Sequence, residues 1–358
     1  MFAATFTRRK ALSAAAVLLA AAFGTGAVAF NSIAPAAAAT QLTGAGSTFD
    51  YPLFAKAFYE YSQQHSDVAV NYQAIGSGGG IQQFTAKTVD FGASDVPLNP
   101  DELKRAEDAG GPVLQIPVAL GGVAIGYNIP GVGKGLRLNG SVIANIYLGK
   151  ITTWNDPAIA KLNPNVKLPD LPIVAVHRSD GSGTSYIFTD YLSSVSPEWK
   201  SKVGIGKSVQ WPAQNSVGGK GNEGVAGQVR QTPGAIGYIE LAYVLQNQMA
   251  YAQIENKAGR FVYPAVDTVR AAAATKPNVS PRDFSIVNRP GADSYPIAGY
   301  SWVIVFENPS DKARGKMVRE VMSWLVTKGQ DIAGTLDYVP LPSNVQKVAT
   351  SIIGQMKV

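Results

Sequence analysis

The chain has 358 residues and a mass of 37.7 kDa, enough for two domains of ordinary size or one large one. Its residues are 46% hydrophobic and 16% charged, a globular composition that argues against a disordered or fibrous chain. It has no cysteine and only two histidines, which excludes disulfides, thiolate chemistry and a lipid anchor on cysteine, and argues against a multi-histidine metal centre. We therefore expect neither a metal nor a cofactor.

The N-terminus is typical of a cleaved signal peptide over residues 1–39. It contains no acid, and an Arg-Arg-Lys triplet at 8–10 precedes an apolar run at 11–23 that is too short to span a bilayer comfortably. The alternative is a buried N-terminal helix. Without this leader the chain keeps 28 of its 31 basic residues against 25 acids, so the net charge falls from +6 to +3. We therefore expect a soluble periplasmic protein that binds no nucleic acid.

Beyond the leader, short apolar runs alternate with helical patterns, which is typical of an α/β protein. Strands are predicted at 68–73, 113–118, 123–127, 173–176, 235–238 and 302–306. A helix is predicted from the apolar spacing of Leu53, Phe54, Ala57, Phe58 and Tyr61. An Asn-Pro-Asp-Glu capping sequence at 99–102 predicts a second helix that ends at Gly110. Two more helices are predicted to begin near Ser310 and Ser343.

Three loops rich in Gly, Ser and Thr each lead into a predicted helix. They lie at 43–49, 75–80 and 180–185, and the helices are expected to start near Tyr51, Ile81 and Tyr186. Glycine lets the backbone approach a ligand, hydroxyls add donors, and a helix N-terminus leaves N–H groups unpaired. This combination predicts a site for a small anion. A fourth glycine-rich segment, 218–224, could equally be a structural turn.

Named catalytic and nucleotide motifs are incomplete. The sequence Gly-Lys-Ser at 206–208 ends like a P-loop, but Ser201 stands where the first glycine is required. No serine lies in a Gly-x-Ser-x-Gly elbow. A Ser-His-Asp triad would need His65, which ends a predicted helix, or His177, which continues a predicted strand. For both histidines we favour a structural role.

Two charged residues flank the start of the third loop. Arg178 and Asp180 could form a local surface ion pair of little energetic consequence. The functional interpretation is a guanidinium fork directed at an oxyanion and held by its carboxylate partner.

Five segments resemble the phosphate-binding proteins of bacterial high-affinity phosphate ABC importers. They are 42–49, 89–95, 146–151, 178–185 and 218–222, and the resemblance runs from about Leu42 to the C-terminus. It implies a type II periplasmic-binding-protein fold, in which two α/β lobes are joined by two crossover strands and the ligand lies in the cleft between them. Lobe I would comprise 40–120 and 298–358, and lobe II 121–297. The crossovers would lie near 118–123 and 295–301.

The resemblance also implies the ligand contacts. Carried over by motif, the phosphate-binding residues are Thr48, Phe49 through its backbone, Ser77, Asp95, Arg178, Ser182, Gly183 through its backbone, and Thr184. Asp180 would orient Arg178. The sequence departs from the family pattern at Gly78, where a second serine is usual, and at Asp50, where a proline is typical. An acid at position 50 would lie near the mouth of the site and slow anion entry slightly.

The function that the resemblance implies is capture of inorganic phosphate and its delivery to the membrane permease of an ABC importer with a cytoplasmic ATPase. The protein would be a monomer and no enzyme. The alternatives are a binding protein for sulfate or molybdate and an exported phosphatase, which needs a nucleophile and usually metals. Asp95 favours phosphate, because an ionised carboxylate only accepts hydrogen bonds and phosphate, unlike sulfate, still carries a proton near neutral pH.

Overall fold

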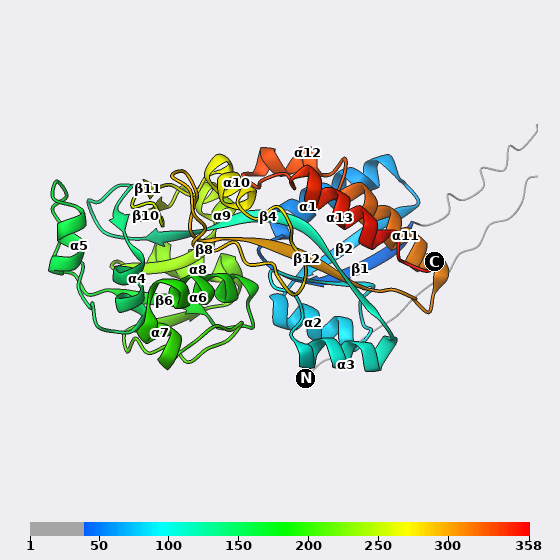
Figure 1. The fold of residues 1–358 in the computed structure, drawn as a ribbon, viewed down its shortest axis with the longest axis horizontal. Coiled ribbons are helices and arrows are strands. Elements are labelled where there is room, and N and C mark those ends of the chain that lie inside the picture. The colour runs from blue at the N-terminus through cyan, green and yellow to red at the C-terminus, as the bar shows by residue number, and fades with distance from the viewer. Residues whose placement is uncertain (1–38) are drawn as a thin grey trace, which may run out of the picture. The chain divides into compact units, whose positions relative to one another are not determined.

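The computed structural model describes residues 39–358, so the predicted signal peptide lies outside the described residues except for Ala39. The described chain contains a nine-stranded mixed sheet in the order β2-β1-β3-β12-β4-β8-β6-β7, with β9 pairing to β4. A second sheet has the order β11-β10-β5. Figure 1 shows β4 and β12 running lengthwise through the molecule, with α1, α11 and α13 at one end and α4 to α8 at the other. The predicted α/β class is confirmed.

The elements have the following bounds. The strands are β1 (Thr40–Gly46), β2 (Val68–Ala74), β3 (Phe91–Ser94), β4 (Val113–Tyr127), β5 (Arg137–Leu138), β6 (Val174–Arg178), β7 (Ser216–Gly219), β8 (Ala235–Glu240), β9 (Ala250–Tyr251), β10 (Gln253–Glu255), β11 (Phe261–Val262) and β12 (Ala298–Phe306). The helices are α1 (Tyr51–Gln64), α2 (Ser77–Thr85), α3 (Pro100–Gly110), α4 (Gly140–Tyr147), α5 (Pro157–Leu162), α6 (Gly183–Val195), α7 (Pro197–Lys202), α8 (Gly221–Gln231), α9 (Leu241–Gln246), α10 (Val266–Ala274), α11 (Lys312–Leu325), α12 (Gln330–Ala333) and α13 (Ser343–Ile353), with a 3-10 turn, η1 (Gly334–Leu336).

The helices predicted from apolar spacing and capping are confirmed. All five apolar residues predicted on one face of α1 are buried. In α3, the Asn99 side chain accepts from the Glu102 N–H at 2.8 Å, and the Glu102 carboxylate accepts from the Asn99 N–H at 3.0 Å. Both groups of the capping box are therefore satisfied. The start of α11 differs slightly, because Asp311 rather than Ser310 caps it by accepting from the Arg314 N–H.

The two strands predicted at 113–118 and 123–127 are one continuous strand, β4. Gly121 and Gly122, which lie between the two predicted stretches, are part of the strand and allow close packing. A Cβ atom at Gly121 would lie 2.7 Å from the Phe49 ring, and one at Gly122 would lie 3.0 Å from Val269. β4 changes partner at this point, pairing with β12 up to Gly122 and with β8 from Val123. The lobe boundaries stay a prediction.

Strands β1, β3 and β7 are not among the predicted strands, because their glycines obscure the pattern. Throughout its length β1 pairs in parallel with β2, and it also pairs with β3. Gly44 lies under the Phe91 ring, where a Cβ would come within 2.1 Å of a ring carbon. Small residues are therefore required in this strand for an aromatic side chain to cover its backbone.

Two of the helices after the loops begin earlier than predicted. Helix α2 starts at Ser77 rather than Ile81, and α6 starts at Gly183 rather than Tyr186. At Gly80 the neighbouring strand β1 leaves no room for a side chain. A Cβ at Gly80 would lie 2.3 Å from Gly46 Cα.

The two histidines have structural positions, as predicted. His65 ends α1 and stacks on Tyr61 with ring centroids 4.2 Å apart. His177 lies in β6 and stacks on Trp211 at 5.1 Å.

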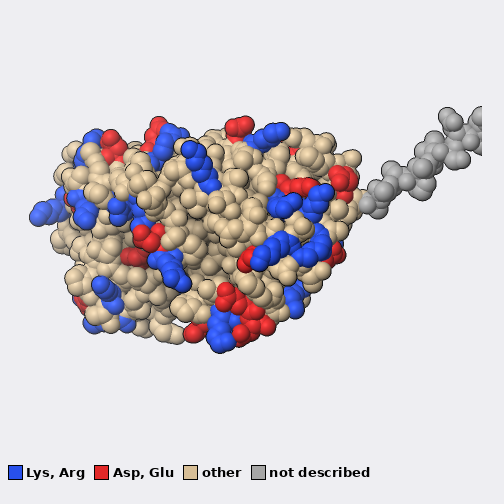
Figure 2. Space-filling view, turned by 45° about the vertical axis from the view of Figure 1, so that its right-hand side comes forward, with Lys and Arg blue, Asp and Glu red and all other residues tan. Residues whose placement is uncertain are grey.

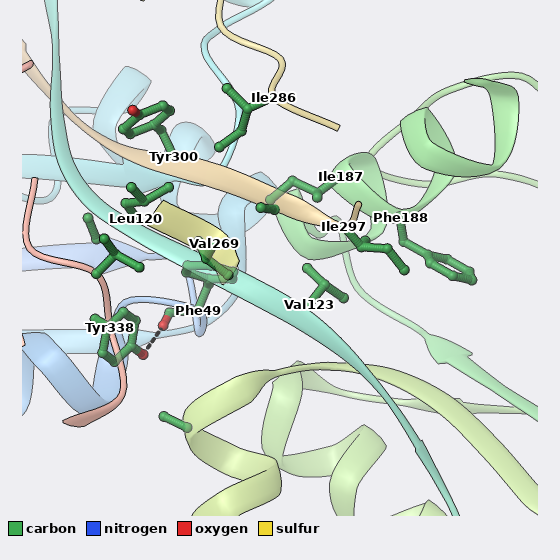
Figure 3. Packing of buried hydrophobic residues seen from close by; sticks show 14 of the residues in the cluster. Phe49, Leu120, Val123, Ile187, Phe188, Val269, Ile286, Ile297, Tyr300 and Tyr338 are labelled. Carbon is green, nitrogen blue, oxygen red and sulfur yellow. Dashed lines mark hydrogen bonds between the residues drawn. The ribbon is translucent and has the colours of Figure 1, made fainter. Parts of the chain in front are cut away.

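Buried side chains from distant segments meet around β4. Figure 3 shows Phe49 and Tyr338 beside Leu120 on this strand, with Val123 further along it and Ile297 just before β12. The Phe49 and Tyr338 rings meet edge to face, with centroids 6.2 Å apart.

The surface mixes charges of both signs. On the face that Figure 2 shows, lysine and arginine side chains are interspersed with acidic ones. In residues 39–358, no helix is both long and apolar enough for a membrane span.

Candidate anion-binding site

The predicted loops meet at the carboxyl ends of parallel strands. β1, β3, β6 and β7 end at Gly46, Ser94, Arg178 and Gly219, and the residues that follow each strand lie in one cluster. The second and third loops touch backbone to backbone, since the Gly78 N–H donates to the Gly181 carbonyl at 2.8 Å. This edge of parallel strands is the usual place for a ligand in an open α/β sheet.

Asp95 lies at the centre of the cluster and is 2% exposed. Its Oδ1 accepts from the Ser301 hydroxyl at 2.9 Å and from the Ser47 hydroxyl, and its Oδ2 accepts from the Thr184 hydroxyl at 3.4 Å. Burial raises the pKa of Asp95, while the hydrogen bonds from Ser47 and Ser301 and the charge of Arg178 oppose the rise. The carboxylate is therefore held by hydroxyl donors on several segments.

Arg178 is buried, so the surface ion pair considered for it is wrong. Its Nε and Nη2 donate to the two oxygens of Asp180 at 2.7 and 2.6 Å, and its Nη1 lies 3.4 Å from the Thr184 hydroxyl. Burial works against the charge of Arg178, but Asp180 outweighs it and raises the pKa of the guanidinium. Burial likewise opposes ionisation of Asp180, yet the hydrogen bonds from Arg178 lower the pKa of its carboxyl group. The carboxylate partner predicted to hold the guanidinium is therefore present, and the direction of Arg178 toward an oxyanion stays a prediction.

Three tyrosines fix the backbone of the first loop. The hydroxyls of Tyr72 and Tyr243 donate to the carbonyls of Ser47 and Thr48 at 2.8 and 2.6 Å. The hydroxyl of Tyr338 donates to the carbonyl of Phe49, the bond drawn in Figure 3. Three consecutive carbonyls are thus held by side chains from β2, α9 and the segment before α13. Such a loop can present its other groups to a ligand with little rearrangement.

Ser77 and Gly183 join the start of α2 to the start of α6, and Ser182 lies next to them. The Ser77 hydroxyl accepts from the Gly183 N–H at 3.0 Å and from the Asp95 N–H at 3.3 Å. Ser182 caps α6, because its hydroxyl accepts from the Ser185 N–H at 3.0 Å. The residues proposed from the resemblance are therefore close together, and their role as ligands stays a prediction.

The fourth glycine-rich segment belongs to the site, which the sequence left open. Asn222 donates from its backbone and side chain to the Thr48 hydroxyl at 3.0 and 2.9 Å, and from its side chain to Thr184 at 3.2 Å. The Gly221 N–H donates to Asp180 at 3.1 Å. Asn222 was outside the predicted set, although the 218–222 segment carried part of the resemblance.

Three further residues of the cluster had no prediction or a wrong one. Ser47 and Ser301 both donate to Asp95, and the position of Ser301 on β12 has no sequence signal that links it to the loops. Asp50 was expected near the mouth of the site, but it is 0% exposed. Its Oδ2 lies 2.6 Å from the Ser301 hydroxyl oxygen. The acid points inward to Ser301, and its side chain makes no capping hydrogen bond to α1.

The cluster can bind an anion through hydrogen bonds. It contains several hydroxyls, backbone N–H groups at the start of α2 and α6, and one buried guanidinium. Within the described residues, no group of three or more His, Asp or Glu side chains is arranged as a metal site.

Comparisons with known proteins agree with this geometry. The family model described as a PBP superfamily domain matches residues 31–328. The phosphate-binding protein PstS of Pasteurella multocida is 46% identical over 90% of this chain and 92% of its own length. PstS of Haemophilus influenzae is 44% identical over 87% of this chain and 92% of its own.

Solved structures show the same fold. A high-affinity periplasmic phosphate-binding protein with bound phosphate superposes with a TM-score of 0.71, at 20% identity over 87% of this chain and 93% of that one. A phosphate-binding protein from Stenotrophomonas maltophilia gives 0.68 at the same identity, over 87% and 94%. The predicted type II periplasmic-binding-protein fold is confirmed. By sequence, the chain belongs to the PstS family of phosphate-binding proteins within the PBP superfamily.

Proposed function

We propose that the protein binds inorganic phosphate in this cluster and delivers it to the membrane permease of an ABC importer. The observation that carries the proposal is Asp95, a buried carboxylate in the middle of a set of hydrogen-bond donors. An anion that still carries a proton can donate it to this carboxylate, whereas a fully deprotonated anion would place two acceptors against each other.

The energetics support a tight and selective site. A buried anion is costly unless nearly all of its oxygens accept hydrogen bonds. The Thr184 hydroxyl donates to Asp95 and lies 3.4 Å from Arg178, and the hydroxyls of Thr48 and Ser77 lie in the same cluster. A hydrogen bond to a charged group contributes about 1.5–3 kcal/mol. Several such bonds suffice for capture without a high net charge. A site built around one specific hydrogen bond rejects an analogue that lacks it by about 10⁴-fold or more.

Calorimetry with phosphate, arsenate and sulfate tests the proposal. We expect tight phosphate binding, weaker but measurable arsenate binding and no sulfate binding. In Asp95→Asn, a neutral amide donor replaces the acceptor, so sulfate exclusion should relax more than phosphate binding weakens. A parent protein that does not bind phosphate would refute the function. A variant that excludes sulfate as strongly as the parent would instead refute only the role of Asp95.

The remaining parts of the proposal concern closure, partners and location. The phosphate ligands would be Thr48, Phe49, Ser77, Asp95, Arg178, Ser182, Gly183 and Thr184, with Asp180 orienting Arg178. Phosphate would bridge lobe I and lobe II and favour their closed arrangement. The protein would act as a periplasmic monomer, and the permease would work with a cytoplasmic ATPase. A smaller radius of gyration with phosphate present would support closure.

Exported phosphatase activity is the competing possibility, and it would appear as hydrolysis of a generic phosphomonoester by the purified protein. We propose that the protein is not an enzyme. Turnover that copurifies with the protein and is lost in Arg178→Lys would overturn this part of the proposal.

A further inference from the structure

One serine connects two buried acids. The Ser301 Oγ lies 2.6 Å from Asp50 Oδ2 and 2.9 Å from Asp95 Oδ1. A hydroxyl has a single proton, so Ser301 can donate to only one of the two carboxyl groups. If both acids were ionised, one short contact would set a serine oxygen against a carboxylate oxygen with no proton between them. One of the two acids must therefore supply a proton.

We propose that Asp50 is a neutral carboxylic acid that donates its proton to Ser301, so that Ser301 donates to Asp95 and keeps Asp95 an ionised acceptor. Asp50 is then a positioning residue for the phosphate site. Its role rests on the proposed function, because Asp95 matters for specificity only if the site binds phosphate.

The surroundings of Asp50 favour its neutral form. The residue is 0% exposed, and its Oδ1 has no hydrogen-bond partner among the described residues. A carboxylate oxygen without a donor in a dry interior is costly, whereas the carbonyl oxygen of a neutral acid is tolerated far better. The positive end of α1 would stabilise a carboxylate at its N-cap, but the Asp50 side chain makes no capping hydrogen bond.

The groups that face Asp50 from neighbouring elements add no positive charge. They are Tyr72 on β2, Asp95 after β3, Glu240 at the end of β8 and Tyr338 before α13. Burial, and then the charge of Asp95, raise the pKa of Asp50 well above its usual range. At Asp95 the hydrogen bonds from Ser47 and Ser301 and the charge of Arg178 counteract burial. The proton that one of the two acids must supply therefore belongs to Asp50 and not to Asp95.

The arrangement has a consequence for anion selection. With the proton on Asp50, the Oδ1 of Asp95 accepts from Ser301 and Ser47. Its Oδ2 accepts from Thr184 and has a second lone pair that can accept a proton from the ligand. If the proton moved to Asp95, this residue would become a donor and the reason to exclude sulfate would be lost. Asp50 thus keeps the site selective for a protonated anion.

Infrared spectroscopy of the ligand-free full chain tests the protonation state directly. The difference spectrum between the parent and Asp50→Asn at neutral pH should contain the C=O band of a protonated carboxyl group. Asp190→Asn is the matched control for a replaced acid, because Asp190 accepts from a serine, Ser285, at 2.6 Å outside the site. A spectrum in which Asp50→Asn removes only carboxylate bands would overturn the proposal, whether or not the protein binds phosphate.

Phosphate binding by Asp50→Asn gives a second, independent measurement. An asparagine amide can replace the acid as donor to Ser301, so we expect the phosphate dissociation constant to change by less than about threefold. Removal of a negative charge from an ionised Asp50 would instead tighten binding by more than about tenfold. The tighter result would contradict a neutral Asp50.

The pH profile of Ser301→Ala tests the connection to Asp95. The Ser301 hydrogen bond lowers the pKa of Asp95, so its loss should raise that pKa. Sulfate binding, which requires a protonated Asp95, should then begin at a higher pH than in the parent. Ser193→Ala is the control, since the Ser193 hydroxyl is buried without a partner in the described structure. An unchanged pH onset in Ser301→Ala would refute the chain of hydrogen bonds.

Discussion

Substitution of Gly183 by alanine tests whether the start of α6 must touch the segment after β3 for the site to bind phosphate. A Cβ atom at this position would lie 2.5 Å from Asp95 Cβ and 2.7 Å from the Asp95 backbone N. Ordinary carbon contacts are about 3.5–4.0 Å, so α6 and the segment after β3 would have to separate by about 1 Å. Neither atom is the end of a flexible side chain, so a change of rotamer cannot relieve the overlap.

The separation would weaken two hydrogen bonds that join these segments. The Gly183 N–H donates to Ser77 at 3.0 Å, and the Thr184 hydroxyl donates to Asp95 at 3.4 Å. The neutral bond contributes about 0.5–1.5 kcal/mol and the bond to a charged group about 1.5–3 kcal/mol. A combined loss of about 2–4 kcal/mol corresponds to phosphate binding that is weaker by about 30-fold to several hundredfold.

Calorimetry with phosphate measures the effect, and the melting temperature without ligand checks the fold. Gly227→Ala is the matched control, because Gly227 lies in α8 with nothing within 4 Å of a built Cβ. It should leave binding unchanged and stabilise the helix by up to about 1 kcal/mol. If Gly183→Ala binds phosphate as tightly as the parent, the close approach of these segments is not needed for binding.

Two further predictions concern charged residues. Lys207 Nζ lies 2.5 Å from both carboxylate oxygens of Glu102, and both side chains are mostly buried. The pair connects predicted lobe II to predicted lobe I, so its loss should weaken the closed arrangement. Lys207→Ala should therefore release phosphate about tenfold faster in stopped-flow measurements. The control is Lys104→Ala, which removes the exposed ion pair with Asp108 and should leave the rate of phosphate release unchanged. Equal phosphate release rates in the Lys207 and Lys104 variants would argue against the role of Lys207. Burial raises the pKa of Glu240 well above its usual range. The folded state therefore keeps a proton that the unfolded state loses as the pH rises above about 4. Between that pH and the raised pKa of the folded state, the free energy of unfolding falls. Glu240→Gln should therefore raise the melting temperature by at least about 2 °C at pH 8 and little at pH 4, whereas an equal shift at both pH values would contradict a neutral Glu240.

The sequence was informative where one local pattern determined the structure. The capping residues of α3 and the apolar face of α1 depend on neighbours a few positions apart, and both predictions are confirmed. The ligand loops were found because glycine, hydroxyl residues and a helix start coincide. Their resemblance to a known family then identified residues that the structure brings together.

The sequence was uninformative where packing between distant segments decides the conformation. The sequence predicted two separate strands on either side of Gly121 and Gly122, but the side chains that cover these glycines belong to the distant Phe49 and Val269. The inward position of Asp50 depends on Ser301, which lies 251 residues away in the chain. A pattern of neighbouring residues contains no information about such a partner.

Glycines of the second and third loops have a physical role that differs from the role first assigned to them. We expected them to open the backbone to a ligand, yet several of them instead allow one loop to touch another. A Cβ at Gly76 would lie 2.1 Å from the Asp180 carboxylate, and the Cβ atoms of Gly78 and Gly181 would each lie 3.1 Å from the other residue's Cα. A serine at position 78, as is usual in the family, would therefore crowd the Gly78–Gly181 contact in this chain. At Gly78 the chain thus lacks one hydroxyl donor, while the backbone N–H of this residue donates directly to the Gly181 carbonyl at 2.8 Å.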